Sequence, residues 1–307
     1  MPTYQEAIEQ VSQPGAPFAM TTEVVDGVEL KMFENTPKSL RAIFDTARAR
    51  GEDTFLVYED ERWSFADTMA AVDALAAALV EDYGLQQGDR VAISMRNYPE
   101  WIVAFAAITS VGGVSVSMNA WWTEDETRYG LEDSGAKILV VDPERAAISA
   151  KTAADHGFRM IVARSEGAEL PEGATRWEDA LKGGAAMPEI DVQPDWDATI
   201  LYTSGTTGFP KGAVSTHRAV TSTLTAFACS AILSVLRSPP KEPKPDGAPA
   251  HPVSFILIVP LFHVTGAIAV MMSCFAAGYK LVMMYKWDPE RALELIERER
   301  VTRFVGV

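Results

Sequence analysis

From about residue 54 onward, short apolar runs alternate with stretches whose apolar residues recur at helical spacing. The apolar run 91–95, for example, is followed by Pro99-Glu100 and a helical pattern that extends to about Ser110. Proline favours the first turn of a helix, because the N–H that it lacks would have no helical partner there. Strands separated by helices predict parallel sheets that are covered on both faces. The pattern therefore restricts the chain to the α/β class.

The same periodicities predict the individual elements. Thr123 and Glu126 have the spacing of a capping box, which marks the start of one helix. We expect helices over 68–83, 99–110, 123–133, 218–236, 266–277 and 288–300, and one that begins at 143. We expect strands over 91–95, 114–118, 137–142, 160–163, 198–202, 213–215, 254–259, 280–284 and 302–307.

Two segments have the composition of linkers. Residues 166–195 are rich in Gly, Pro and acidic residues, and we expect them to divide two sub-sheets. Residues 237–252 contain six prolines, which excludes a helix or strand interior and predicts an exposed loop. A docking or membrane-contact loop is the alternative to a plain surface insertion. Residues 301–307 resemble a strand entering a sheet, so we expect the architecture to continue past residue 307.

The charge and cysteine content exclude several classes of protein. The chain has 42 acidic and 27 basic residues, a net charge of −15, which argues against a nucleic-acid partner but allows a local basic pocket. Cys229 and Cys274 are too few for a disulfide scaffold or a cysteine-built zinc site. They fit reduced thiols in a cytoplasmic protein. No basic residue precedes Lys31, so we expect no signal peptide.

Two uncharged stretches deserve comparison with a membrane span. Residues 220–236 include six Ser or Thr, and residues 252–279 are interrupted by Pro260, His263 and Gly266. A spanning helix needs about 20 mostly apolar residues in one run. We therefore expect both stretches to lie in a protein core and predict no transmembrane segment. Peripheral membrane contact stays open.

The most informative segment is a loop of small residues. After an apolar strand, six consecutive small residues at 203–208 precede Phe209, Pro210, Lys211 and Gly212. Glycines let backbone N–H groups approach phosphate oxygens, hydroxyls donate hydrogen bonds, and lysine adds a positive charge. A Walker A loop is excluded, because Pro210 and Gly212 flank the lysine. A phosphate site is favoured over a plain flexible loop.

This segment, TSGTTGFPKG, resembles the phosphate-loop signature of the adenylate-forming superfamily, which includes acyl- and aryl-CoA ligases, peptide-synthetase adenylation domains and luciferases. Every position matches, with Phe209 at the variable one. The similarity extends over about 36–307, and it is also carried by WSFADTMAAVDALAAAL, GDRVAISMRNYPEW, NAWWTEDETRYGLEDSGAKILVVD and PLFHVTG. The resemblance implies an α/β fold of two stacked αβαβα-type sub-sheets, truncated in a strand at the C-terminal end.

The resemblance also implies a domain organisation. On this basis the chain would have an N-terminal extension at 1–35 and a first α/β subdomain at about 36–195. An incomplete second subdomain at 196–307 would carry the phosphate loop. The family's adenine-stacking motif, its Thr-Gly-Asp ribose segment and its C-terminal lid domain with a catalytic lysine are absent from these residues. We therefore expect little or no turnover from this chain alone.

In this family a carboxylate attacks the α-phosphate of ATP to give an acyl-adenylate and pyrophosphate, and in CoA ligases the CoA thiol then displaces AMP. The resemblance implies ATP, Mg²⁺, CoA and a small carboxylic acid as ligands. His263 matches the family's histidine beside the acyl and adenylate pocket, the alternative being a core histidine. Thr203 is also a candidate Mg²⁺ ligand. The implied phosphate-binding residues are Thr203, Ser204, Gly205, Thr206, Thr207, Gly208 and Lys211.

The leading interpretation is an acyl-CoA synthetase for fatty or other hydrophobic acids. An aryl-acid ligase or a peptide-synthetase-type adenylation domain is an alternative within enzymes. A non-catalytic nucleotide- or acyl-binding remnant is the alternative outside them. Apolar residues after His263 fit helix packing more simply than an acyl pocket, and Trp121 and Trp122 are also expected to pack. His217 is expected to start a helix rather than to act in catalysis.

Overall fold

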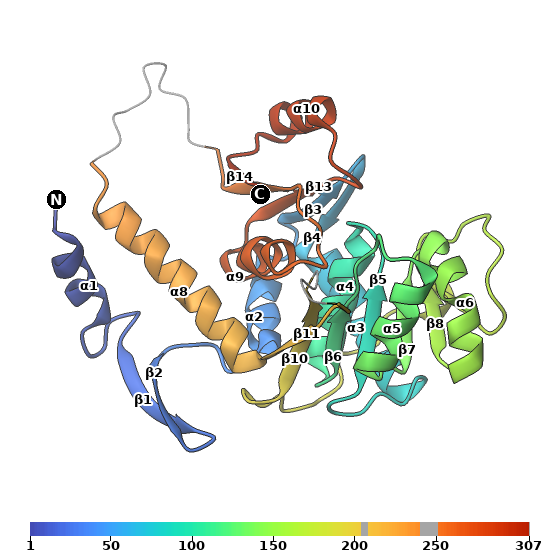
Figure 1. The fold of residues 1–307 in the computed structure, drawn as a ribbon. Helices are drawn as coiled ribbons and strands as arrows, with labels where there is room; N and C mark the ends of the chain where they lie inside the picture. The colour runs from blue at the N-terminus through green and yellow to red at the C-terminus, as the bar shows by residue number, and fades with distance from the viewer. Residues whose placement is uncertain (204–207, 240–250, 307) are drawn as a thin grey trace.

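The computed structural model describes residues 1–203, 208–239 and 251–306, and it contains two mixed sheets with helices around them (Figure 1). The larger sheet has seven strands in the order β11-β10-β6-β5-β7-β8-β9. All of its neighbouring strands are parallel except the pair β10 and β11. Its members are β5 (Arg90–Ser94), β6 (Val114–Ser117), β7 (Ile138–Val141), β8 (Arg159–Val162), β9 (Thr175–Arg176), β10 (Asp197–Tyr202) and β11 (Gly212–Thr216).

The smaller sheet has five strands in the order β14-β12-β13-β3-β4. Only its pair β3 and β4 is antiparallel. Its members are β3 (Thr54–Tyr58), β4 (Glu61–Ser64), β12 (Ser254–Leu257), β13 (Lys280–Met283) and β14 (Arg303–Val305). A separate hairpin pairs β1 (Met20–Val25) with β2 (Val28–Phe33). The predicted α/β class is confirmed, and each antiparallel pair lies at an edge of its sheet.

The sheets exchange strands across the expected boundary at residue 195. Strands β10 and β11 follow that residue but join the seven-stranded sheet, whereas β3 and β4 precede it and join the five-stranded sheet. We expected the segment 166–195 to divide two sub-sheets, but it contributes β9 to the larger sheet and also contains the short helix α7 (Trp177–Ala180). Parallel strands are joined by long crossovers, so their order in the sequence does not show which sheet they enter.

The predicted helices are present, and the structure adds α1, α2 and α7. The predicted helix 266–277 is a π-helix (Thr265–Met272) followed by α9 (Ser273–Ala277). The remaining helices are α1 (Tyr4–Ser12), α2 (Leu40–Ala47), α3 (Phe65–Glu81), α4 (Pro99–Ser110), α5 (Glu124–Ser134), α6 (Pro143–His156), α8 (His217–Leu236) and α10 (Pro289–Glu299), with a 3-10 turn at Arg48–Arg50. The capping box of Thr123 and Glu126 forms as predicted.

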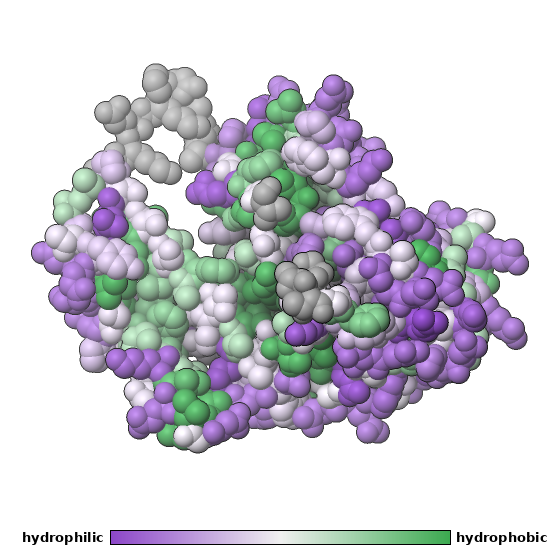
Figure 2. All heavy atoms as spheres, in the orientation of Figure 1, coloured by the Kyte–Doolittle hydropathy of each residue, from purple (hydrophilic) through white to green (hydrophobic). Residues whose placement is uncertain are grey.

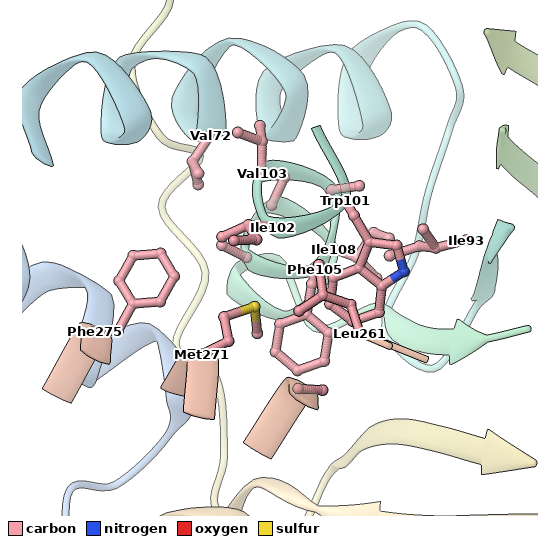
Figure 3. Close-up of a cluster of buried hydrophobic side chains, with 14 of the residues drawn as sticks. Val72, Ile93, Trp101, Ile102, Val103, Phe105, Ile108, Leu261, Met271 and Phe275 are labelled. Carbon is pink, nitrogen blue, oxygen red and sulfur yellow. The ribbon is translucent and has the colours of Figure 1, made fainter. Parts of the chain in front are cut away.

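One hydrophobic core joins the two sheets. Every residue of α4 is buried, as is typical of a helix that is apolar on all sides. Trp101 and Phe105 of this helix stack with their ring centroids 5.5 Å apart. The same cluster includes Leu261, Met271 of the π-helix and Phe275 of α9 (Figure 3). The elements on both sides of residue 195 therefore share one core.

Helix α8 is largely exposed, contrary to the prediction that residues 220–236 lie in the core. Only 28% of its most apolar window is buried, and Phe227 and Val235 are exposed. The helix runs along one side of the molecule (Figure 1), where α1 is its neighbour. By length and composition alone α8 could cross a membrane, but a single helix of this kind is weak evidence for a span.

The first residue of α8 connects this helix to α2. His217 starts the helix as predicted, and its side chain is fully buried. The backbone N–H of Leu40 donates to His217 Nδ1 over 3.2 Å. Burial lowers the pKa of His217 from 6.5 to about 4. The imidazole is therefore neutral at pH 7, which its role as an acceptor requires.

This burial predicts a pH-dependent stability. The unfolded chain binds a proton at His217 near pH 6.5 and the folded chain only near pH 4, so stability should fall as the pH drops through this window. The loss should reach about 3 kcal/mol and level off below pH 4. Urea unfolding between pH 4 and 7.5 should show a shallower dependence in His217→Asn. The exposed control His251→Asn should keep the wild-type slope, and equal slopes in all three proteins would contradict the assignment.

Candidate active site

Strands β10 and β11 form a hairpin that holds the two ends of the phosphate-loop segment together. Tyr202 pairs with Gly212, and one residue further the N–H of Thr203 donates to the carbonyl of Lys211 over 2.9 Å. Both Thr203 and Lys211 are exposed. Ser204, Gly205, Thr206 and Thr207, predicted from the sequence, lie outside the described residues. The structure thus brings the first and last of the predicted phosphate-binding residues together at the base of one loop.

The β10 end of the hairpin is fixed to α5. Tyr202 is buried, and its hydroxyl donates to Asp133 Oδ2 over 2.7 Å. Burial, with the Asp133 carboxylate in second place, raises the pKa of Tyr202, so the phenol keeps its proton. The Tyr202 ring also meets Trp122 edge-on at 5.3 Å. Gly130 is required there, because a Cβ would lie 2.5 Å from the Trp122 ring.

The β11 end of the loop also contacts α5. The ring of Phe209 stacks on Tyr129, with centroids 4.6 Å apart and planes 23° apart. Gly208 has a φ of +132°, a backbone conformation that favours glycine. At Gly212 a Cβ would lie 2.7 Å from Ile200 Cγ2, so only glycine fits beside β10. Both ends of the loop are therefore positioned by packing rather than left free.

The loop leaves the sheet at the carboxyl ends of its parallel strands. Strands β5, β6 and β10 are parallel neighbours, so Arg96, Trp121 and Thr203 follow their carboxyl ends on the same edge. In open α/β sheets, ligands bind outside this edge. The Trp121 ring meets Phe262 edge-on at 5.1 Å, which brings the segment after β12 to the same place. The predicted phosphate residues and the His263 segment thus belong to one edge of the fold.

His263 is exposed, and hydrogen bonds from the Asn97 side chain hold the backbone that precedes it. Asn97 Nδ2 donates to the carbonyl of Val259 over 3.1 Å, and Asn97 Oδ1 accepts from the N–H of Leu261 over 2.9 Å. The Phe262 and His263 rings lie 4.8 Å apart. Partial burial lowers the pKa of His263, which favours a neutral imidazole at pH 7. A neutral imidazole offers one hydrogen-bond donor and one acceptor to a ligand, and its exposure excludes the alternative of a core histidine.

A tight turn then leads from His263 into the π-helix. The N–H of Ala267 donates to the carbonyl of His263 over 2.9 Å. A Cβ on Gly266 would lie 2.2 Å from the carbonyl oxygen of Pro260, so the two backbone segments meet too closely for a side chain. π-Helical turns are rare and often occur at functional sites. The glycine in PLFHVTG is thus needed for the close approach that positions His263.

The apolar residues after His263 are divided between the core and the surface. Ala267, Val270 and Met271 are buried, as expected for helix packing, but Val264 is 59% exposed. Trp122 packs in the interior as predicted, whereas Trp121 is 55% exposed despite its contact with Phe262. These two tryptophans differ because Trp122 covers Gly130 and Tyr202 while Trp121 borders the site edge.

An apolar groove of about 490 Å³ lies between α8 on one side and β12 and residues 269–279 on the other. Figure 2 shows the apolar surface in the hollow beside α8. The residues that line it include Leu224, Phe227, Ala231, Phe255, Ala269 and Tyr279. The groove has the chemistry to accept an apolar chain or ring.

Two polar residues at this edge had no role assigned from the sequence. Arg96 and Asn97 follow directly after the predicted strand 91–95. This position at the end of a parallel strand is the feature of the sequence that could have indicated a role in the site. Arg96 lies beside the Trp121 ring and Asn97 holds the backbone before His263. In the described ranges, no group of three or more His, Cys, Asp or Glu residues is placed to hold a metal ion.

Comparisons with a family model, with curated proteins and with solved structures all point to the same family. A family model described as AMP-binding enzyme matches residues 43–307. The long-chain-fatty-acid–CoA ligase of Bacillus subtilis (strain 168) is 27% identical over 300 residues, which are 88% of this chain and 50% of that protein. The 2-succinylbenzoate–CoA ligase of Bacillus pumilus (strain SAFR-032) is 31% identical over 251 residues, 82% of this chain and 45% of that protein. The chain spans about half the length of these relatives.

Solved structures show the same architecture. The O-succinylbenzoate coenzyme A synthetase of Bacillus subtilis in complex with AMP has a TM-score of 0.66 at 25% identity, over 86% of this chain and 61% of that one. Apo MatB from Rhodopseudomonas palustris has a TM-score of 0.67 at 26% identity, over 88% and 49%. The predicted fold and the predicted resemblance are both confirmed.

The close approach at Gly266 predicts a specific stability defect. Gly266→Ala should push the backbone away from Pro260 and destabilise the protein by about 2 kcal/mol or more. Gly183→Ala is the matched control, since no atom lies within 4 Å of its added Cβ. Urea unfolding measures the loss, and NMR of the His263 imidazole reports whether the turn has moved. Wild-type values for both readouts in Gly266→Ala would contradict the assignment.

Proposed function

This chain belongs to the AMP-binding enzyme family, and on that basis we propose that it serves the ATP-dependent activation of a carboxylic acid to an acyl-adenylate, followed by transfer of the acyl group to CoA. In the first step a carboxylate oxygen bonds to the α-phosphorus of ATP and pyrophosphate leaves. In the second the CoA thiol attacks the acyl carbon, loses its proton, and AMP leaves.

The hairpin of β10 and β11 carries the proposal. It places Thr203 and Lys211 at the base of a loop whose sequence is rich in glycine and hydroxyl residues. We assign Thr203, Ser204, Gly205, Thr206, Thr207, Gly208 and Lys211 to the ATP phosphates. Packing of both loop ends on α5 reduces the reorganisation that a polyphosphate would otherwise require. Because the chain as a whole carries a net charge of −15, binding of an anion such as ATP depends on local positive charge, which Lys211 supplies.

His263 is assigned to the carboxylate. Its imidazole is exposed beside the Phe262 ring, and the lowered pKa favours a neutral donor over an ion-pair partner. It would orient the carboxylate, or hydrogen bond to charge that develops during adenylation. Mg²⁺ bound by phosphate oxygens would neutralise charge on the nucleotide, and Thr203 is the residue we assign to reach it.

We assign a hydrophobic acid to the groove beside α8. The groove beside α8 is lined mostly by apolar side chains and is large enough for an aliphatic chain or an aromatic ring. Relatives are named for long-chain fatty acids, 4-coumarate and 2-succinylbenzoate, so an aryl acid is a second candidate. A cytoplasmic location is supported by two unpaired cysteines, of which Cys274 is fully buried.

The phosphate assignment predicts a binding defect in Lys211→Gln. Loss of one charge-assisted contact should weaken the binding of Mg·ATP and of pyrophosphate roughly tenfold. Lys151→Gln on the exposed side of α6 is the control and should bind as the wild type does. Isothermal titration calorimetry of the 307-residue chain measures both ligands. No binding of either ligand to the wild type, or equal affinity in Lys211→Gln, would overturn the phosphate assignment.

A panel of acids separates the substrate classes. Decanoate, 4-coumarate, 2-succinylbenzoate and phenylalanine can each be added with Mg·ATP while thermal unfolding is followed. A hydrophobic acid should raise the unfolding temperature, because only the folded chain binds it. Stabilisation by phenylalanine alone would favour an amino-acid-activating enzyme instead.

A further inference from the structure

The guanidinium of Arg96 lies over two aromatic rings at the carboxyl end of β5. Its Cζ is 5.5 Å from the centroid of Trp121 and 5.7 Å from that of Tyr285. These rings follow β6 and β13, so the contact joins the two sheets at the edge that carries the candidate site. Trp121 in turn contacts Phe262, the neighbour of His263. A chain of contacts through Trp121 and Phe262 therefore links the Arg96 cation to the proposed carboxylate-binding residue.

The comparison with Arg164 shows what Arg96 lacks. Arg164 also lies over two rings, at 4.9 Å from Tyr58 and 5.1 Å from Tyr98. Its nitrogens, however, donate to Glu61 over 2.5 and 2.8 Å and to Glu100 over 3.1 Å. In the part of the chain that the structure describes, no carboxylate pairs with Arg96, and its buried Nε has no hydrogen-bond partner.

A buried donor without a hydrogen-bond partner is unfavourable, because it has lost its bonds to water and gained none in the protein. Aromatic rings contact the faces of a guanidinium and leave its in-plane N–H groups without acceptors. The fold thus holds Arg96 Nε in a buried position. None of the described residues supplies an acceptor for it. An oxyanion is the ligand that satisfies a planar guanidinium best, since two of its oxygens can accept in parallel.

The backbone around Arg96 is held in place before any ligand arrives. The N–H of Arg96 donates to Asp142 Oδ2 over 3.3 Å, and Arg145 contacts the same carboxylate at 3.2 Å. The next residue, Asn97, clamps the backbone before His263. The positions of Arg96 and His263 are therefore coupled through a single short segment. Such preorganisation lowers the cost of binding.

We propose that Arg96 binds an oxyanion of a substrate, a carboxylate or a phosphate, at the edge shared by Trp121, Tyr285 and His263. The identity of the available oxyanions rests on the proposed function, which offers the carboxylate of the acid and the phosphates of ATP and CoA. The geometry at Arg96 itself is independent of the loop around Lys211. The chemical class is a planar or tetrahedral oxyanion that can accept two hydrogen bonds.

Three probes distinguish the sources of this oxyanion: decanoate, Mg·ATP and CoA, each titrated alone into the 307-residue chain. Arg96→Gln should weaken at least one of them roughly tenfold. Arg96→Lys, which keeps the charge but loses the planar fork, should retain part of the affinity. Arg159→Gln is the matched control, because Arg159 also lies over a ring, Tyr83 at 3.9 Å, but at the amino end of β8. It should bind every probe as the wild type does.

A second measurement follows ligand binding directly in the wild-type protein, so that its result does not depend on how stable the variants are. The ¹⁵N–¹H resonance of Arg96 Nε, assigned by its loss in Arg96→Lys, should move with the same probe that Arg96→Gln weakens. The proposal is overturned if this resonance stays fixed with all three probes, or if Arg96→Gln binds each of them within twofold of the wild type. Wild-type binding of decanoate at Arg96 without binding of Mg·ATP would instead overturn the phosphate assignment and leave Arg96 supported.

Discussion

Burial of α4 is the constraint on which the rest of the structure depends. The helix contacts β5 and β6 of the larger sheet as well as α2 and α3, and the core that holds it continues to Leu257 and Leu281 of the smaller sheet. Removing this much apolar surface from water is the dominant favourable term in folding. Because the same core packs against both sheets, it holds the carboxyl ends of their strands close together at one edge.

Charged residues join the sheets at this edge as well. Arg164, which follows β8, pairs with Glu61 of β4 and with Glu100 of α4. Burial raises the pKa of Glu100 even though Arg164 opposes the shift. A partly buried ion pair of this kind adds little net stability, but loss of Arg164 would leave the Glu100 carboxylate uncompensated. It therefore favours one relative position of the two sheets, and the candidate site lies between them.

The candidate site combines exposed side chains with buried supports. Lys211 and His263 are exposed, while Tyr202, Asn97 and the packing of the loop ends on α5 are held by the fold. Such a division would favour the proposed reaction, since groups that are already oriented need not be ordered when charge develops. Arg96 extends the pattern, because its guanidinium is positioned by two rings and its buried Nε has no acceptor in the described ranges.

The sequence by itself determined the α/β class, most of the elements and the phosphate-loop segment, because helical periodicity, capping and glycine-rich loops depend on residues that are close in the chain. The location of His217 at a helix start was likewise a local property. Tertiary structure alone decided that β10 and β11 join the larger sheet and that α8 is exposed. It also decided that His217 is buried and that Arg96 lies over Trp121 and Tyr285. These features depend on contacts between distant segments, which periodicity does not encode.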